Sequence, residues 1–358
     1  MSETNTISNR QSNFELLRII AMLMIVLVHA NYFSLGAPNQ SDIQSSPFLS
    51  FWRILAEQFC IVGVNVFILI SGWFGIKPSL KGLCSLLYQV FFWGCLLVVV
   101  GLLFNLAFPI KPCLKVFWFG GYYWFIIAYI GLYLISPVLN AFLDKTTPKS
   151  LLALIICFFI TEFIFGWIIN SESYNAGYSV FSFIGLYLLA RFIRLYVSSK
   201  RLSRPIVYFL TYFLMTIIPT IISFFAIKSG GKQLHPLFYT SPFVITAAAS
   251  LLLFFSTFEF KNAVINWIGC STFCIYLIHT HPVILPRFTA FVQHLWGVFQ
   301  PIPFSLIIVL FSVAFLVICA SLDKIRIISW KWISSHFMNA LICKSEKSFD
   351  KMLITILK

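Results

Sequence analysis

The chain has 358 residues, of which 60% are hydrophobic and only 10% are charged, whereas a typical soluble domain has about 25% charged residues. This composition excludes an ordinary soluble protein, because too few polar side chains are available to cover its surface. The 25 Lys and Arg residues outnumber the 11 Asp and Glu residues and give a net charge of +14. In a membrane protein such an excess reflects topology and contact with anionic membrane lipid, so we expect no nucleic-acid partner.

Apolar runs of about 20 residues, the length that crosses about 30 Å of hydrocarbon as a helix, recur along the chain. We therefore predict an all-α, polytopic membrane protein with about ten transmembrane helices. In chain order these cover residues 14–33, 53–73, 83–108, 118–139, 151–169, 178–196, 205–227, 236–257, 263–283 and 303–322.

The basic residues predict how the chain crosses the membrane. If the N-terminus is cytoplasmic, the inner segments hold far more Lys and Arg than the outer loops, so we predict that both ends lie inside. Residues 1–322 then form the membrane domain and residues 323–358 a basic cytoplasmic tail, which is either an interfacial helix on anionic lipid or solvated. A signal peptide ending near Ala30 is a weaker alternative, because its first segment would be long and contain two acidic residues. The oligomeric state is left open.

Ionisable side chains inside the predicted helices mark candidate sites, because a charge in hydrocarbon costs at least about 2.5 kcal/mol. Arg18 and His29 stand eleven residues apart in the first helix. This separation is about three helical turns, so both side chains point the same way, about 16 Å apart along the axis. One face of this helix therefore links the predicted inner surface with the outer half of the membrane.

The predicted topology gathers two further groups of polar residues. Glu162 and His279 lie in the outer half at the level of His29, where Arg53 and Glu57 begin the second helix. Cations gather on the inner side, where they suit an anionic, phosphate-bearing cytosolic ligand: Arg18, Lys77, Lys81, Arg191 and Arg194.

Each of these residues also has a structural interpretation. Arg18 is alternatively an inner-surface anchor paired with Glu15, and His29 an interfacial histidine. Arg53 and Glu57, four residues apart, favour a structural ion pair. No metal site is predicted, because the cysteines show no CxxC pair and His-x-His at 279–281 would place the two rings on different helix faces.

Four short motifs resemble the acyltransferase family 3 membrane proteins. They are Asn13 to Ala21 followed by His29; Gly63 to Phe67 ending in Ser71-Gly72; Trp124-Phe125 followed by Tyr133 to Pro137; and Ile268-Gly269 with Ser271, followed by Tyr276 to His279. The motifs occur in the order seen in the family and cover the chain from about residue 13 to 283. One departure is the segment from Lys77 to Lys81, where family members often carry an Arg-x-Arg pair.

The resemblance implies an integral membrane O-acyltransferase of the bacterial inner or plasma membrane. Such an enzyme moves an acyl group, usually acetyl, from cytosolic acetyl-CoA to a hydroxyl of a surface polysaccharide or lipid-linked sugar. His29 and Arg18 match the family's essential histidine and arginine. By the same resemblance, Arg18 contacts the donor, together with Lys77 and Lys81 in place of the arginine pair.

Acyl transfer to an alcohol needs a base, donors for the oxyanion and two positioned substrates. His29 is the predicted catalytic group, either as a base or as a transient acyl carrier. The residues predicted to bind or orient substrate around it are Glu57, Ser71, Glu162, Tyr276 and His279. The alternative is a transporter or flippase that passes a lipid-linked glycan through the same polar cavity without chemistry.

Overall fold

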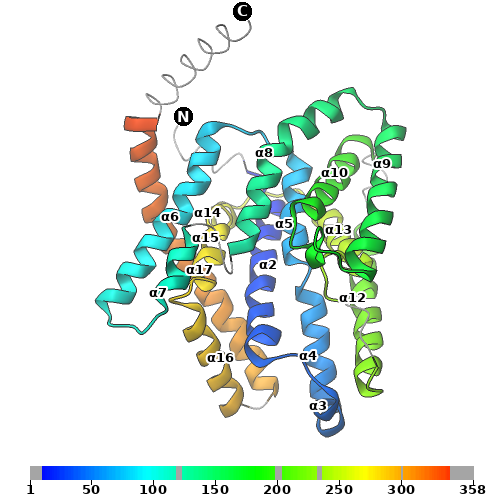
Figure 1. Ribbon diagram of the computed structural model, residues 1–358, viewed down its shortest axis with the longest axis vertical. Helices are drawn as coiled ribbons and strands as arrows, with labels where there is room; N and C mark the ends of the chain where they lie inside the picture. Colours follow the sequence, from blue (N-terminus) through cyan, green and yellow to red (C-terminus); the bar gives the residue numbers. More distant parts are fainter. Residues whose placement is uncertain (1–9, 118–122, 198–203, 232–235, 300, 339–358) are drawn as a thin grey trace, which may run out of the picture.

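The computed structural model describes residues 10–117, 123–197, 204–231, 236–299 and 301–338, and every regular element in these ranges is helical. The elements are α2 (Ser12–Val28), η1 (His29–Phe33), α3 (Gln40–Ser45), α4 (Pro47–Cys60), α5 (Gly63–Phe74), α6 (Leu80–Leu103), α7 (Ile110–Val116), α8 (Trp124–Lys145), α9 (Pro148–Thr161), η3 (Glu162–Ile168), η4 (Asn175–Gly177), α10 (Val180–Tyr196), α12 (Pro205–Lys228), α13 (Pro242–Ser256), α14 (Ala263–Gly269), α15 (Thr272–His279), α16 (Leu285–Val298), α17 (Pro301–Ile333) and η5 (Ser334–Met338). Figure 1 shows them as one bundle with α2 and α5 near its centre.

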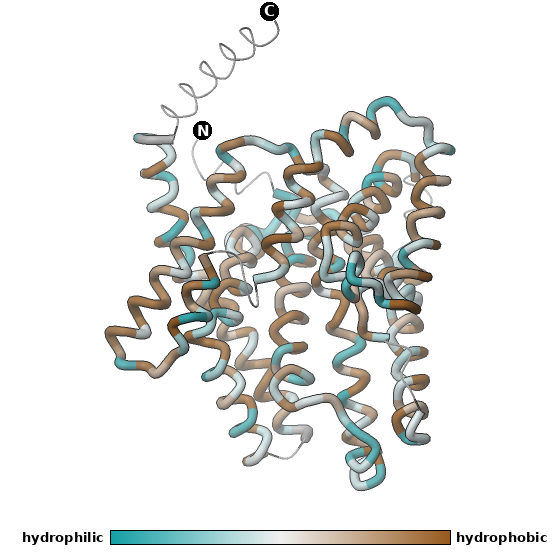
Figure 2. The backbone as a smooth tube through the Cα atoms, viewed as in Figure 1, coloured by the Kyte–Doolittle hydropathy of each residue, from teal (hydrophilic) through white to brown (hydrophobic). Residues whose placement is uncertain are grey.

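Seven helical stretches of the described residues are long and apolar enough to cross a membrane. They are Ser12–Phe33, Pro47–Phe74, Leu80–Leu103, Trp124–Lys145, Pro148–Ile168, Pro205–Lys228 and Pro303–His336. Apolar residues dominate their length, and polar stretches occur at α3 and at the turn between α8 and α9 (Figure 2). The all-α, multi-pass prediction is thus confirmed, while the number of ten and the inside location of both ends stay predictions.

The other three predicted spans correspond to shorter or broken helices. They are α10 with 17 residues, α13 with 15 residues, and the pair α14 and α15 in place of one helix over 263–283. The predicted helix over 53–73 is also divided, into α4 and α5, by a turn at Ile61 and Val62. The start of the predicted helix over 118–139 falls outside the described residues, and α8 begins at Trp124.

Two glycines let α5 pack closely against two of its main neighbours. A Cβ atom on Gly63 would lie 2.7 Å from the carbonyl oxygen of Ala21 in α2. A Cβ atom on Gly72 would lie 2.7 Å from the carbonyl oxygen of Tyr187 in α10. Because small residues allow helix backbones to approach in a membrane, these glycines place α5 between α2 and α10.

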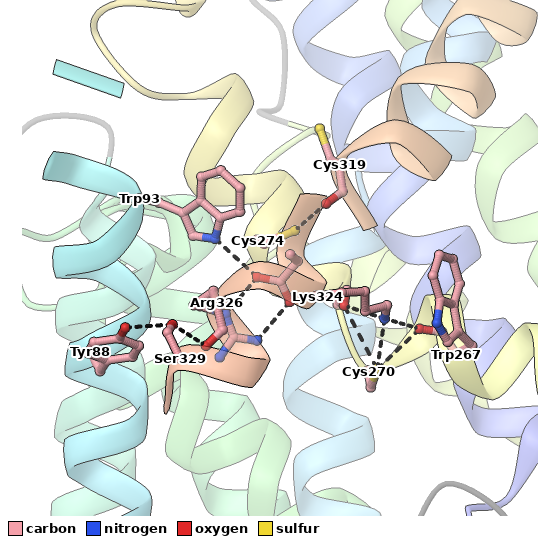
Figure 3. Close-up of polar contacts among 11 residues, drawn as sticks. Tyr88, Trp93, Trp267, Cys270, Cys274, Cys319, Lys324, Arg326 and Ser329 are labelled. Carbon is pink, nitrogen blue, oxygen red and sulfur yellow. Dashed lines mark hydrogen bonds and ion pairs between the residues drawn. The ribbon is translucent and has the colours of Figure 1, made fainter. Parts of the chain in front are cut away.

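Helix α17 continues past the predicted end at residue 322 and reaches Ile333, so that predicted helix boundary is wrong. Figure 3 shows why: charged residues of the supposed tail are packed against the bundle. Asp323 accepts two hydrogen bonds from Arg326, at 2.6 and 2.7 Å, and one from the indole of Trp93 at 3.1 Å. The ammonium of Lys324 donates to the carbonyl oxygen of Trp267 at 2.6 Å and lies 4.1 Å from the centre of its ring. The rest of the predicted tail, residues 339–358, lies outside the described residues.

Helix α16 occupies a connection that carried no predicted helix. It lies beside η1 and α17 near the same end of the bundle as α3 (Figure 1). Gln293 of α16 donates a hydrogen bond to the carbonyl oxygen of Ser34 at 2.9 Å, just beyond η1. This contact supports the end of the first membrane helix, where His29 lies.

Candidate functional site

A cavity of about 430 Å³ lies beside the second half of α2, among α4, α5, α8, α15 and the segments that precede α10 and α13. Its wall is largely apolar and aromatic, as in many sites for small molecules. Its main polar lining residues are His29, Tyr32, Glu57, Tyr178, Tyr239 and Tyr276.

His29 stands where the α-helix α2 changes into the π-helical turn η1. Such turns are frequent at functional sites, because the extra residue re-aims side chains. The Nδ1 atom lies 2.7 Å from the carbonyl oxygen of Ile25. Since a carbonyl oxygen only accepts, Nδ1 carries the proton and Nε2 keeps its lone pair. Among the described residues Nε2 has no hydrogen-bond partner, so this half-buried histidine presents a basic nitrogen at the cavity.

A second histidine lies directly against His29. The rings of His29 and His279 have centroids 4.9 Å apart and meet edge to face at 80°. His279 is fully buried in α15, and its Nδ1 atom lies 2.7 Å from the carbonyl oxygen of Ile275. The structure therefore brings these two predicted residues together, with His279 behind the cavity wall.

Glu57 reaches the cavity from α4 and is held by the turn of η1. One of its oxygens, Oε2, accepts a hydrogen bond from the side-chain amide of Asn31 at 2.9 Å and from the backbone N–H of Tyr32 at 3.4 Å. The prediction of an ion pair between Arg53 and Glu57 is wrong, because these two side chains, both in the described part of the chain, do not form one. Asn31 lies between them, and the guanidinium of Arg53 donates to its Oδ1 at 3.1 Å instead. Asn31 was missed, although a polar residue two positions after His29 is a visible signal.

Three aromatic side chains form one wall of the cavity. The ring of Trp124 lies 4.3 Å from that of Tyr178 and 5.9 Å from that of Tyr239, and the two tyrosine rings lie 5.1 Å apart. Asn65 of α5 holds this wall by donating to the carbonyl oxygen of Tyr239 at 2.9 Å. Tyr178 and Tyr239 each present a phenol hydroxyl at the cavity, which can donate a hydrogen bond. Neither tyrosine was predicted as a site residue, and both come from connecting segments.

Arg18 lies on the same face of α2 as His29, with Met22 and Ile25 of the cavity wall between them. Its guanidinium forms an ion pair with Glu15, which also binds Arg10 at 3.1 Å, and lies 5.9 Å from the ring centre of Phe74. The pair with Glu15 was the structural alternative for Arg18. It is present, and it leaves the side chain 26% exposed at the start of the helix.

Of the remaining predicted residues, some lie at or near the cavity and others do not line it. Tyr276 lines the cavity, and Ser71 lies about one helical turn beyond its wall residue Phe67, 3.5 Å from the hydroxyl of Tyr129. Glu162 is buried in η3 and is not among the lining residues of the cavity. Lys77 and Lys81 are exposed at the start of α6 and do not line it either. Within the described residues, no group of three or more His, Cys, Asp or Glu side chains is placed to hold a metal ion.

Residues 11–322 match the model of a protein family described as an acyltransferase domain. The match covers His29, Arg18 and all the elements that form the cavity. No match was found among curated proteins or among solved structures.

Proposed function

The chain belongs to this acyltransferase family, and on that premise we propose that it moves an acetyl group from cytosolic acetyl-CoA to a hydroxyl of a surface polysaccharide or lipid-linked sugar. The family and the apolar helices make it a multi-pass membrane acyltransferase. The bacterial inner or plasma membrane, the donor and the acceptor class are parts of the proposal.

The observation that carries the proposal is the basic Nε2 atom of His29 at an aromatic-walled cavity. In the proposed reaction this nitrogen takes the proton of the acceptor hydroxyl while the hydroxyl oxygen attacks the thioester carbonyl. The C–S bond then breaks, and the departing thiolate of CoA takes the proton from His29. The tyrosine hydroxyls of the cavity supply donors for the transient oxyanion.

The two ends of the site suit two different substrates. Arg18 lies at the predicted cytoplasmic end, where an anionic donor arrives, and His29 lies about 16 Å further along the helix. The aromatic wall of Trp124, Tyr178 and Tyr239 offers flat apolar faces against which the C–H groups of a sugar ring pack. This arrangement supports transfer between substrates that enter from opposite sides.

The proposal is tested by the acetyl content of the cell-surface glycan, measured by NMR on a strain that lacks the gene. We expect the acetyl signals to disappear and to return when the wild-type gene is restored. If the amount of glycan falls while its acetylation is unchanged, the transporter or flippase alternative replaces the proposal.

A substitution at Glu57 tests the acceptor side of the cavity. Glu57→Gln keeps the shape of the side chain but turns one carboxyl oxygen into an amide NH2 group, so an acceptor hydroxyl that donates to this oxygen loses its partner, which costs about 1–3 kcal/mol. We expect the KM for glycan purified from the deletion strain to rise about tenfold or more, with the KM for acetyl-CoA unchanged. Glu172→Gln, at an exposed position before α10, is the matched control. An unchanged acceptor KM in Glu57→Gln would show that this carboxylate does not contact the acceptor.

A further inference from the structure

A second cavity of about 430 Å³ lies at the end of the bundle where α2 begins and where α5, α10 and α13 end. Its lining includes three cations, Arg10, Arg194 and Lys261, and a single acid, Glu259. The charge pattern predicts that this end faces the cytoplasm. A cavity with this excess of positive charge suits an anionic, phosphate-bearing molecule.

Two of the cations are available to a ligand. The guanidinium of Arg194 lies 5.1 Å from the ring centre of Trp73, which fixes its position. Within the described residues, neither Arg194 nor Lys261 forms an ion pair with an acidic side chain. Arg10 differs, because it binds Glu15 and thereby joins the ion pair that contains Arg18.

One face of α2 runs from this cavity to the catalytic one. Phe14 lines the second cavity, while Met22, Ile25 and His29 line the first. Arg18 lies between them on the same face, because residues three or four apart are neighbours along a helix. Phe14 also packs 5.0 Å from the ring of Phe74, over which Arg18 lies. From Phe14 to His29 the helix rises about 22 Å.

We propose that the second cavity binds the nucleotide end of the acyl-CoA donor, with its pantetheine arm lying along this face of α2 toward His29. This inference rests on the proposed function and locates the donor phosphates near Arg194 and Lys261 in place of Lys77 and Lys81. Arg194 and Lys261 pair with the phosphates, and Arg18 lies beside the path of the arm. The ring of Phe260, 39% exposed, offers a face for the adenine.

Binding of three probes to the purified, full-length protein tests the inference: coenzyme A, 3′-dephospho-coenzyme A and pantetheine. We expect wild type to bind coenzyme A about tenfold more tightly than the dephospho form, because a charge-assisted phosphate contact is lost. The double variant Arg194→Gln, Lys261→Gln should lose about tenfold or more in affinity for coenzyme A and lose this preference. Its affinity for pantetheine should stay at the wild-type value, which also shows that the variant is folded.

Two comparison variants and a lipid complete the experiment. Lys149→Gln, at an exposed position in α9, is the matched control for loss of a cation. If Lys77→Gln with Lys81→Gln lowers the affinity for coenzyme A while the cavity variant binds normally, the inference is overturned. The purified protein is also tested in detergent micelles that contain phosphatidylglycerol. If this lipid abolishes the binding of coenzyme A, the inference is overturned, because the cations of the second cavity then bind lipid headgroups. If wild type binds neither coenzyme A nor pantetheine, the proposed function fails together with the inference.

Discussion

His29→Ala is expected to lower the rate of acyl transfer by about 10²- to 10⁴-fold, the usual contribution of a positioned general base. The reason is that Nε2 of His29 keeps its lone pair at the wall of the first cavity. The neighbouring His279 cannot take this role, because it is buried behind that wall. Because His29 is half-buried and, within the described part of the chain, its ring forms a hydrogen bond only to a carbonyl of its own helix, the variant should keep its place in the membrane. The rate is measured with radiolabelled acetyl-CoA and membranes that contain the acceptor glycan.

The control for His29→Ala is His294→Ala, which removes an exposed histidine from α16 and should transfer acetyl at the wild-type rate. Normal transfer by the His29 variant would remove this residue from the mechanism. Rapid denaturation at neutral pH of wild type mixed with labelled acetyl-CoA, without acceptor, separates the two roles of the histidine, because an acetyl-imidazole would hydrolyse in acid. As a base, His29 leaves the protein unlabelled, whereas an acyl carrier leaves the label on the protein.

The alignment of Arg18 with His29 could be predicted because it depends on one helix alone. The period of the α-helix fixes which residues share a face, whatever packs around it. The meeting of His29 with His279 needed the topology as well. It followed from the expectation that both helices cross in the same direction, so both residues reach the same level.

The surroundings of His29 could not be predicted, because they depend on contacts between segments far apart in the chain. Spacing within α4 favoured a pair between Arg53 and Glu57, but the amide of Asn31 enters between them from η1. The tyrosines at 178 and 239 precede two different helices and meet only after α10 and α13 are packed. Glu162 was predicted to lie at the level of His29. A shared depth in the membrane does not show which helices are neighbours, so it could not indicate whether Glu162 lines the same cavity.

The sequence also predicted too short a last helix, because charges at 323, 324 and 326 indicated the end of the apolar run. A charged residue ends a membrane helix only where its side chain has to be hydrated. Here Asp323 and Arg326 satisfy each other inside the bundle, and Trp93 of α6 binds the same carboxylate (Figure 3). The helix therefore continues because its charges are paired.

Arg326→Ala is accordingly expected to destabilise the fold strongly. Removing one partner leaves the carboxylate of Asp323, which is fully buried, without its opposite charge. Breaking a buried ion pair in this way costs about 3–5 kcal/mol in the free energy of unfolding. The loss is measured by denaturant titration of the purified protein in detergent, with Lys149→Ala in α9 as an exposed control expected to change little.

The double variant Asp323→Asn, Arg326→Gln separates the effect of charge from that of packing. It removes both charges and keeps an oxygen at position 323 for the indole N–H of Trp93. Because no unpaired charge remains buried, the double variant should be more stable than Arg326→Ala alone. If Arg326→Ala unfolds at the wild-type denaturant concentration, residues 323–333 contribute nothing to the bundle. They would then act as a tail outside the bundle, either the interfacial helix or the solvated segment that the charge pattern allowed.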